Sequence, residues 1–434
     1  MGIYRSYLFV TWEGGGNVPA VLGVARRLAD RGHRVRVLTE PCLEEAVRGM
    51  GAEFVAFTRH FTRQDRHQPL LDDFEAKSPI AALKRSFDRV MFGPARIVAE
   101  ETYRAILAEP TDAVVVDHLM IAALVAAEAA GVPRVVLFHT PEYLPGPGKP
   151  AAGAGFLPRN DVVGRVRDGL FNAVFLKTIG GYLGVFNEAR QALGLAPLRS
   201  ARDIVDQYHL ADLRLIQTST AFDFPITPLP ANTRYVGPVI DDPDWTTADV
   251  DAWQAPWSTD DDRPLVVASL SSTFQNQGAT LERIIRALGT LDVRGLVTHG
   301  PALDGAFENV PDNVRVVRSA PHGAVFPHAA AVITHAGHGT VIRALAHDLP
   351  VLCLPMGRDQ DDNAARVFAR GAGLRLKPTA APERIAAAVR RLLGEPAFAS
   401  GAQRLGRVIR DDVAADHAVR ALEAVGGAPA VRAA

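Results

Sequence analysis

Residues 332–363 read VITHAGHGTVIRALAHDLPVLCLPMGRDQDDN, and this segment decides the fold. The apolar run from Ala329 to Thr334 is short and ends in β-branched residues, which predicts a buried strand. After a glycine-containing turn, residues 340–346 place apolar side chains at helical spacing and predict a helix. A strand that turns through glycines into a helix is typical of parallel α/β sheets.

The turn between that strand and that helix has the chemistry of an anion site. Gly337 and Gly339 have no Cβ, so a ligand can come close to the backbone. The N–H groups that begin a helix have no partner within it, and the helix dipole places about half a positive charge at that end. We therefore predict that a phosphate binds at this turn.

A second apolar run, Val351 to Met356, predicts the neighbouring strand, and polar residues follow at its carboxyl end. Ligands of open parallel sheets bind outside the carboxyl ends of the strands, so the phosphate turn and Asp359-Gln360 are expected to face one crevice. A carboxylate accepts hydrogen bonds and an amide both donates and accepts them, which suits the hydroxyls of a sugar.

The N-terminal half of the chain shows the same alternation of strand and helix. A strand at 7–11, an amphipathic helix at 19–31 and a strand at 33–39 predict a βαβ unit whose first turn contains three glycines. The glycines lack the spacing G-x-G-x-x-G, so a dinucleotide site is the less favoured interpretation of this turn. The alternation continues with a strand at 112–117, a helix at 121–130 and a strand at 134–138.

Length and proline distribution predict two domains. A chain of 434 residues exceeds what one hydrophobic core usually supports. Prolines accumulate between residues 222 and 264, which is typical of a linker, and a second alternating series begins at Leu265. The expected fold is α/β, with two Rossmann-like, doubly wound parallel-sheet domains facing each other across a cleft. The predicted ranges are 1–222 and 265–410 for the two domains, 223–264 for the linker and 411–434 for a C-terminal helix.

Composition excludes several classes of protein. The content of 48% hydrophobic and 22% charged residues is ordinary for a globular protein, and a net charge of -1 lacks the basic excess of a nucleic-acid binder. No apolar run approaches the roughly 20 residues of a membrane span, and none at the start has the form of a secretory signal. Cys42 and Cys353 lie in apolar surroundings far apart, which favours free thiols and a cytoplasmic location.

Together these motifs resemble the signature of GT-B glycosyltransferases that use nucleotide sugars, above all the bacterial enzymes that glycosylate natural products such as macrolide-type antibiotics. The resemblance rests on His335-x-Gly337-His338-Gly339-Thr340, followed by Pro355 to Gln360 and Asn363. It extends over most of the chain and is weak over 60–110 and 145–210. The further matching stretches are Gly14 to Pro19, Asp112 to Asp117, Tyr235 to Pro238 and Val266 to Thr273.

The resemblance implies a reaction and its partners. A hexosyl or deoxyhexosyl group would pass from a dTDP- or UDP-sugar to a hydrophobic small-molecule acceptor, with inversion and without a metal. No cofactor is expected, because the nucleotide sugar is a substrate. The first domain would bind the acceptor and the second the donor, and the last helix would cross back to the first domain. Neither nucleic acid nor an integral membrane segment is implied, and a homodimer is left open.

The resemblance also assigns roles to residues of the second domain. His322 and Pro321 would hold the nucleobase, although the family often has Trp-x-Pro-Gln where this chain has Ser319 to His322, so stacking on the base is not implied. The diphosphate would be bound by His335, Gly337, Gly339, Thr340 and Ser272, and the donor sugar by Asp359, Gln360 and Asn363.

The chain departs from the family at the base that deprotonates the acceptor. The family has His or Asp in the first turn, held by an aspartate from a later strand. This chain has Gly16 with Asn17 beside it, and Asp117 is the counterpart of the supporting aspartate, with His118 adjacent.

Three hypotheses follow from that departure. Asp117 or His118 is the base, since both lie at a strand end facing the cleft. Alternatively, the acceptor is acidic enough, as a phenol is, to need little help. In the third, catalysis is lost and the chain is an auxiliary nucleotide-sugar-binding protein. Glu13 and His139 are weaker base candidates, supported by their position at strand ends alone.

Two further alternatives stay open. Asp359-Gln360-Asp361 has the D-x-D pattern of a nucleotide–metal site, but we favour a metal-independent site because a helix N-terminus and an imidazole already supply positive charge. Aromatic residues in the less familiar stretches either line an acceptor cavity or pack in a core; they are Phe61, Phe87, Phe92, Phe156 and Tyr143.

Overall fold

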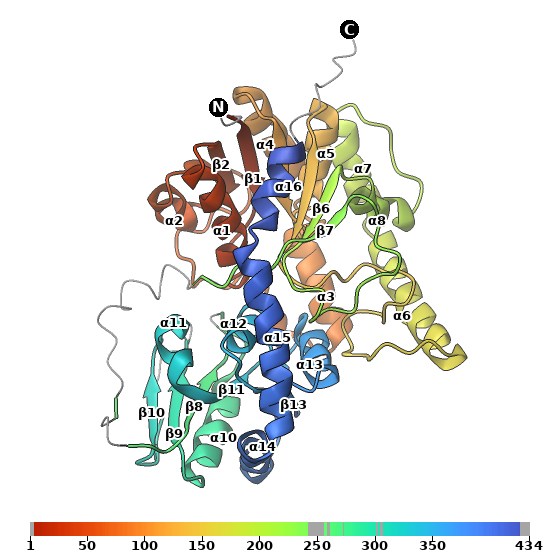
Figure 1. Ribbon diagram of the computed structural model, residues 1–434. Helices are drawn as coiled ribbons and strands as arrows, with labels where there is room; N and C mark the ends of the chain where they lie inside the picture. Colours follow the sequence, from red (N-terminus) through yellow and green to blue (C-terminus); the bar gives the residue numbers. More distant parts are fainter. Residues whose placement is uncertain are drawn as a thin grey trace.

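The computed structural model describes residues 4–241, 256–257, 261–271, 273–300, 303 and 307–425. Two parallel β-sheets, each flanked by helices, form two α/β domains stacked one above the other (Figure 1). The predicted doubly wound α/β fold is confirmed. Ser272 lies outside the described residues, as do much of the predicted linker and the end of the predicted C-terminal range.

The first sheet has seven strands in the order β3-β2-β1-β4-β5-β6-β7, all paired in parallel. Its strands are β1 Ser6–Val10, β2 Arg34–Thr39, β3 Glu53–Ala56, β4 Ala113–Asp117, β5 Arg134–Phe138, β6 Leu213–Ile216 and β7 Thr233–Tyr235. Its helices are α1 Asn17–Asp30, α2 Glu44–Gly49, α3 Pro79–Ser86, α4 Ala95–Ala108, α5 Ala122–Ala130, α6 Val162–Gly180, α7 Leu183–Ala192 and α8 Ala201–His209.

The second sheet has six parallel strands in the order β10-β9-β8-β11-β12-β13. Its strands are β8 Leu265–Ser269, β9 Arg294–Thr298, β10 Val314–Val317, β11 Ala329–Thr334, β12 Val351–Cys353 and β13 Gly373–Arg375. The helices of this half are α10 Gly278–Gly289, α11 His322–Val325, α12 His338–Ala346, α13 Gln360–Ala369, α14 Pro382–Gly394, α15 Pro396–Ala414 and α16 His417–Val425.

The central strands are buried on both faces, as a parallel sheet covered by helices requires. In β1, Tyr7 and Phe9 belong to the hydrophobic cluster on one face, and Leu8 and Val10 belong to the cluster on the other. These side chains have no exposed surface. Because both faces of the sheet are filled, ligands can only bind at the strand ends.

The junction between the domains differs from the predicted linker. β7 lies inside the range 223–264, yet it pairs with β6 as the edge strand of the first sheet. Phe222, predicted in the first domain, is fully buried in the core of the second. The next residue, Asp223, forms an ion pair with Arg366 of α13 at 2.8 Å. The two domains therefore exchange segments at this point, which a composition break does not reveal.

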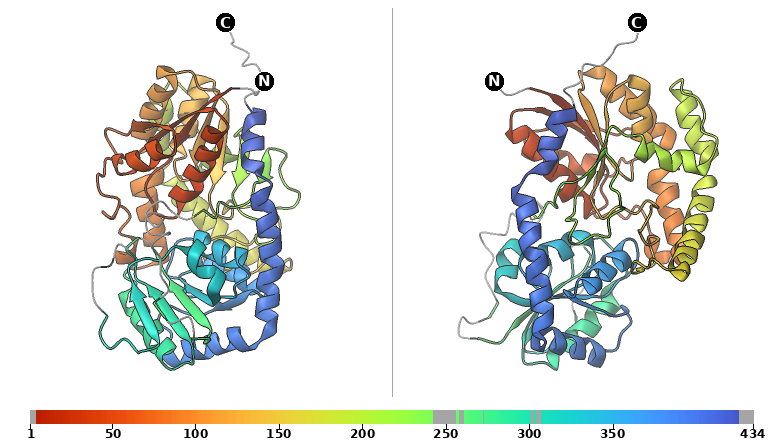
Figure 2. Two further views of the ribbon diagram at one scale, coloured as in Figure 1. Left: turned by 60° about the vertical axis from the view of Figure 1, so that its left-hand side comes forward. Right: turned by 45° about the vertical axis from the view of Figure 1, so that its right-hand side comes forward.

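The last two helices run along both domains and return to the first (Figure 2). α15 packs on α12 in the second domain, while Val419 and Leu422 of α16 join the core of the first. The Tyr7 hydroxyl donates a hydrogen bond to the Leu422 carbonyl at 3.2 Å. Helix α16 thus covers part of one face of the first sheet, beside α1.

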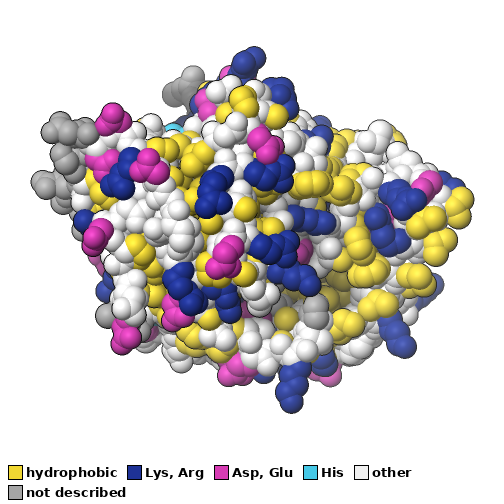
Figure 3. Space-filling model, turned by 90° about the horizontal axis from the view of Figure 1, so that it is seen from below, with side chains coloured by type: hydrophobic (Ala, Val, Ile, Leu, Met, Phe, Trp, Pro, Cys, Tyr) yellow, Lys and Arg dark blue, Asp and Glu magenta, His cyan; other side chains and the backbone are white. Residues whose placement is uncertain are grey.

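Helix α6 carries an unusual exposed apolar surface. Hydrophobic side chains gather on the side of the molecule where this helix lies (Figure 3). Its exposed large hydrophobic residues are Val162, Val163, Val166, Leu170, Phe171 and Val174. Within the described chain, no single helix meets the length and hydropathy of a membrane span, although α6 and α7 do so as a pair bent by 50°.

Candidate functional site

The site is a large cavity of about 1230 Å³ between the two sheets. Residues of both domains line it, including the turns after β1, β4 and β5 on one side and after β8, β11 and β12 on the other. These are the carboxyl ends of the parallel strands, where the fold places ligands.

The predicted phosphate turn opens into this cavity. Ala336 adopts a left-handed conformation with φ of 69°, and Gly337 is the N-cap of α12 without a side-chain cap. The first bond inside the helix runs from Val341 N to Gly337 O at 3.1 Å. The N–H groups of residues 338–340 precede it and are the unpaired first-turn donors of the helix. Gly337, Gly339 and Thr340 all line the cavity.

His335 lies against this turn and is neutral. Burial lowers its pKa to about 3. A Cβ added to Gly337 would lie 2.6 Å from His335 Nε2, so glycine is needed for the ring to lie over the helix start. The structure therefore supports a hydrogen-bonding role for His335 and does not support the expectation that its imidazole carries positive charge.

His338 is buried, and it connects the two domains. Its Nε2 lies 3.0 Å from Thr218 Oγ1, just after β6 of the first sheet, and its ring also makes a hydrogen bond with the backbone of His139. The first residue of α12 is therefore held next to the end of β5. The predicted phosphate turn and the strand ends of the first domain are in direct contact.

The three residues predicted to bind the donor sugar differ in what they can do. Asp359 is partly exposed and lines the cavity. Gln360 also lines it, but its oxygen accepts from Met356 N at 2.7 Å and its amide donates to Gln275 at 2.9 Å. Asn363 is fully buried and donates to Ala336 O and to Asp359 Oδ2. Of these three residues, only Asp359 has a side chain that is partly exposed in the cavity. The side chains of Gln360 and Asn363 are hydrogen-bonded to other protein groups, and they hold the loop and the Asp359 carboxylate in place.

The predicted nucleobase site is built around His322. The His322 ring stacks on Phe326 at 4.3 Å between centroids, and its Nε2 lies 3.1 Å from Ser269 Oγ. Its Nδ1 has no hydrogen-bond partner among the described residues. Pro321 is the N-cap of α11 and does not line the cavity, whereas residues 318–320 do. The role predicted for Pro321 is therefore limited to shaping the loop.

The first-domain side of the cavity carries many apolar residues. Phe87 and Tyr143 line it, while Phe61 and Phe92 are buried in the core, so the two interpretations of the aromatic residues each hold for part of the set. Phe156 packs on Phe171 at 4.8 Å. Helix α6 contributes Leu170, Phe171, Val174 and Phe175 to the wall.

Asp117 lies at the end of β4 and is fully buried. Its Oδ2 accepts hydrogen bonds from Thr11 Oγ1 at 3.0 Å and from Asn17 Nδ2 at 2.9 Å, and its Oδ1 accepts from Leu119 N. Burial alone would raise its pKa, but His139 and Asn17 hold the pKa well below its usual range. This placement argues against Asp117 as the base itself, because an occupied, strongly acidic carboxylate is a poor proton acceptor.

The residue of the first turn that faces Asp117 is Asn17, not Gly16. The Asn17 amide also donates to Trp12 O at 2.8 Å, and its oxygen accepts from Gly14 N at 3.1 Å. Gly16 lines the cavity, with no atom within 4 Å of an added Cβ. The missing family base is therefore replaced by an amide that stabilises the loop and has no basic atom.

Two histidines flank Asp117 beside the cavity. His118 Nδ1 lies 3.3 Å from the Tyr143 hydroxyl, and burial lowers the His118 pKa to about 3, which disfavours it as the base. His139 Nε2 lies 3.4 Å from Asp117 Oδ1. The weaker candidate His139 is therefore the one that contacts the supporting aspartate through its ring.

Asp359 and Asp361 of the D-x-D segment do not belong to a group with metal-ligand spacing among the described residues. The next residue, Asp362, accepts hydrogen bonds from Gly153 N and Gly155 N of the first domain. Within the described residues, the one group with metal-ligand spacing is Asp117 with His118 and His139.

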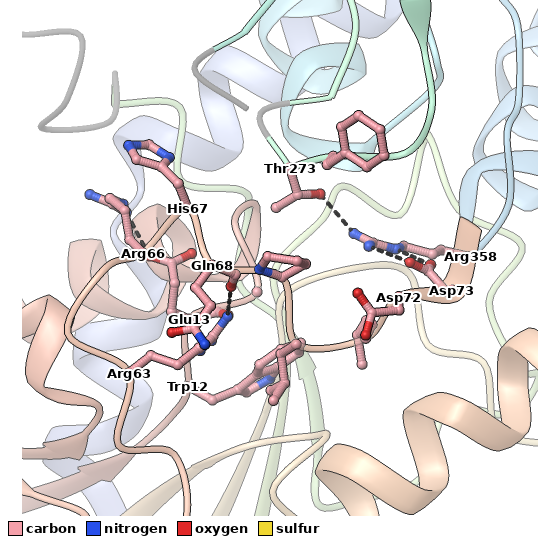
Figure 4. Close-up of a pocket in the computed structure, with 15 residues that line it drawn as sticks. Trp12, Glu13, Arg63, Arg66, His67, Gln68, Asp72, Asp73, Thr273 and Arg358 are labelled. Carbon is pink, nitrogen blue, oxygen red and sulfur yellow. Dashed lines mark hydrogen bonds and ion pairs between the residues drawn. The ribbon is translucent and has the colours of Figure 1, made fainter. Parts of the chain in front are cut away.

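A small second cavity adjoins the main one where the domains close on each other (Figure 4). Arg358 forms an ion pair with Asp73 of the first domain at 2.7 Å and donates to Thr273 at 3.2 Å. Phe74 and Phe274 meet edge to face at 4.8 Å. The carboxylate of Glu13, the other weak base candidate, forms an ion pair with Arg66 at 2.7 Å.

Sequence reasoning missed the residues that join loops across the site. Gln275, which fixes Gln360, and Asp73, which pairs with Arg358, carry no motif. The only signal for Gln275 was its place six residues beyond Ser269, the last residue of β8, in a turn already expected to face the crevice.

This chain is similar to known proteins both in sequence and in fold. The family described as "Erythromycin biosynthesis protein CIII-like, C-terminal domain" matches residues 282–424. The 4'-demethylrebeccamycin synthase of Lentzea aerocolonigenes is 30% identical over 95% of this chain and 96% of its own length. The zeaxanthin glucosyltransferase of Pantoea ananas is 25% identical over 90% and 88%.

Solved structures agree with these relatives. The glycosyltransferase of kitacinnamycin covers 97% of this chain and 98% of its own with a TM-score of 0.74 at 22% identity. VinC, solved in complex with dTDP, covers 96% and 100% with a TM-score of 0.64 at 21% identity. The chain therefore belongs to the GT-B glycosyltransferases of natural-product and antibiotic biosynthesis.

Proposed function

We propose that this glycosyltransferase moves a sugar from a dTDP- or UDP-sugar to a hydrophobic natural-product aglycone, with inversion and without a metal ion. The observation that carries the proposal is one cavity with two unlike walls. The N-terminus of α12 lines one wall, and apolar residues of the first domain line the other.

The donor wall suits a nucleoside diphosphate. The first-turn N–H groups of α12 and the His335 ring can donate hydrogen bonds to the charge that builds on the leaving diphosphate. One such preorganised donor is worth about 3 kcal/mol in transition-state stabilisation. VinC is solved with dTDP, and we extend that class of nucleotide to this chain as part of the proposal. Asp359 would accept a hydrogen bond from a sugar hydroxyl.

The reaction is a single displacement. An acceptor hydroxyl or N–H attacks the anomeric carbon from the first-domain side, the bond to the diphosphate oxygen breaks, and the nucleoside diphosphate leaves on the α12 side. The acceptor proton passes to a base. Because nucleophile and leaving group lie on opposite faces of the sugar, the configuration inverts.

Apolar side chains support a hydrophobic acceptor. The wall includes Phe87 and Met91 from one side and the α6 residues from the other. The stripe on α6 continues from the cavity onto the surface, since Leu170 and Val174 are 64% and 49% exposed. An extended aglycone would cover this stripe on binding.

The test is incubation of purified protein with UDP- and dTDP-sugars and a panel of polyketide, phenolic and indole aglycones, with and without EDTA. Products are followed by mass spectrometry, and the anomeric configuration is read from proton coupling in NMR spectra. A sugar-sized gain that survives EDTA, with inverted configuration, supports the proposal. Loss of product with EDTA removes metal independence, and retention of configuration removes the single displacement.

One observation favours a second candidate. Asn17 occupies the place beside Asp117 where a basic residue is expected. A catalytically impaired, auxiliary nucleotide-sugar-binding protein would have that substitution. Nucleoside diphosphate binding by calorimetry without transfer to any acceptor would favour this candidate.

A further inference from the structure

We propose that His139 is the general base that deprotonates the acceptor, and that Asp117 orients it. The inference rests on the proposed function, because a base is needed only if the protein transfers sugar to an acceptor. It assigns to a residue after β5 the task that other members of the family give to a residue in the first turn.

The register of the first sheet brings the pair together. β4 and β5 are neighbours, and Asp117 is paired with Leu137. His139 follows the end of β5, which places its ring beside the Asp117 carboxylate. The distance of 3.4 Å is an ion-pair contact rather than a short hydrogen bond, and such contacts commonly tighten when substrate binds.

The position of His139 matches where the nucleophile must lie. The ring lines the cavity on its acceptor side, and the backbone of His139 contacts His338 at the start of α12. The sugar of a donor bound at α12 would therefore have its anomeric carbon close to His139. A base must reach the acceptor proton at that point.

The neighbours of Asp117 leave His139 as the better choice of base. Asn17 has no basic atom, and both ends of its amide are bound. His118 is held by Tyr143 and is fully enclosed apart from 3% of its surface. His139 is the more accessible histidine, at 11% side-chain exposure, and its Nε2–H faces Asp117. Its Nδ1 is then the atom that takes the proton.

The proton balance is complete within the site. The acceptor O–H or N–H bond breaks as the new glycosidic bond forms, and the proton moves to His139 Nδ1. The imidazolium is stabilised by Asp117 and is faced by His118 and by His338 from α12, both of which burial keeps neutral. The nucleoside diphosphate leaves with its charge, and His139 returns its proton to solvent when the product departs.

We do not assign a metal to the cluster of Asp117, His118 and His139. The two Asp117 oxygens already accept from the Thr11 hydroxyl, the Asn17 amide and the Leu119 N–H. A cation there would have to displace donors that point at the carboxylate.

The experiment compares single-turnover transfer by wild type, His139→Gln, His139→Ala and Asp117→Asn, with His328→Gln on the surface as control. We expect His139→Gln to slow transfer by about 100- to 10,000-fold for an alcohol acceptor while nucleoside diphosphate affinity and Tm stay close to wild type. The loss should shrink along a series of phenols of rising acidity, and imidazole should restore part of the rate to His139→Ala.

Several results would overturn the assignment. A rate within about threefold of wild type for His139→Gln would do so, as would an equal loss for acidic and non-acidic acceptors. A larger loss in His118→Gln would move the role to that residue, and inactivation by EDTA with recovery on adding Zn²⁺ would make the cluster a metal site.

A second readout separates this inference from the proposed function. Nitrogen NMR of histidine-labelled protein should show His139 as the Nε2–H tautomer, and Asp117→Asn should disturb it. If wild type transfers nothing, the proposed function fails and this signal still tests the pair; a tautomer indifferent to Asp117→Asn would refute the pair even in an active enzyme.

Discussion

The two walls of the cavity are built in opposite ways. On the donor side, the binding groups are mainly backbone N–H donors created by six consecutive residues, 335–340. On the acceptor side, the chemistry lies in side chains that meet from the ends of β1, β4 and β5. A backbone site is a property of local chain geometry, whereas a side-chain site depends on which strands become neighbours.

Substituting one glycine in each wall should give the largest contrast. Gly337→Ala places a Cβ 2.6 Å from His335 Nε2, so the ring or the helix start must move. We expect kcat/KM to fall by about 100- to 1,000-fold, the range seen when a preorganised donor is lost. Gly16→Ala meets no atom within 4 Å and should stay within about threefold. Steady-state kinetics and nucleotide calorimetry measure both; equal losses would contradict the comparison.

Breaking the buried ion pair at the junction tests whether the two walls are held together. Arg366 and Asp223 are 6% and 0% exposed as side chains. Arg366→Ala leaves the buried Asp223 carboxylate without this ion-pair partner, with Tyr235 and Phe224 N as its remaining hydrogen-bond donors, and should cost about 3–5 kcal/mol in unfolding free energy. Chemical denaturation measures this.

A matched control exists on the surface of α14. Arg391 pairs with Glu395 at 2.7 Å, four residues apart and about half exposed. Arg391→Ala should change the unfolding free energy by no more than about 0.5 kcal/mol. If both variants lost the same stability, burial would not be what makes the junction pair matter.

Acid should weaken the donor domain before the acceptor domain. Burial lowers the pKa of His322, His335 and His338 to about 3 in the second domain. Among the described residues of the first domain, it lowers the pKa of His118 to about 3 and also lowers that of the less buried His209. The unfolded chain binds protons below about pH 6.5, so the stability that these neutral rings contribute is complete above that pH and is lost as pH falls toward 3.

Each such histidine contributes a slope of about 1.4 kcal/mol per pH unit where only the unfolded state is protonated. Hydrogen exchange at pH 7.5 and pH 5.0, resolved by domain, should show a larger loss of protection in residues 265–394. A His338→Gln variant should have a flatter dependence on pH. Equal losses in both domains would argue against this distribution of neutral rings.

Breaking the ion pair between Arg358 and Asp73 at the small cavity should have the smallest effect on the kinetics. Arg358 and Asp73 connect the two walls at the edge, with side-chain exposures of 26% and 10%. Asp73→Asn removes this partly exposed pair, worth about 1 kcal/mol, and should raise KM about two- to fivefold with little change in kcat. Initial-rate kinetics at varied donor concentration measure it, and a fall in kcat with unchanged KM would show that the pair acts in the chemical step instead.

Most of the fold and the predicted phosphate turn could be inferred from the sequence, because both depend on patterns within a few neighbouring residues. β5 and β11 have the predicted bounds, and α12 begins two residues earlier than predicted, at His338. Periodicity does not fix which N–H is the first of a helix. It did locate Gly337 at the helix start, since glycine and apolar spacing are read over a few residues.

The other features of the site and of the domain junction depend on contacts between residues that are far apart in the sequence. The amide of Gln360 has the right chemistry for a sugar, yet Gln275 and Met356 N occupy it. His139 acquires importance only when β4 and β5 lie side by side. β7 falls among prolines that suggest a linker, and three residues are too few for a pattern. Composition shows which groups exist, while packing decides which of them are free.

Helix α16 also gives the order of synthesis a structural consequence. Ala418, Val419 and Leu422 complete a cluster that includes Tyr7, Val21 and Leu28 from the start of the chain. These residues leave the ribosome only after the whole second domain. The part of this cluster that α16 covers therefore stays exposed during translation, and its apolar surface is accessible to other nascent chains until the helix is made.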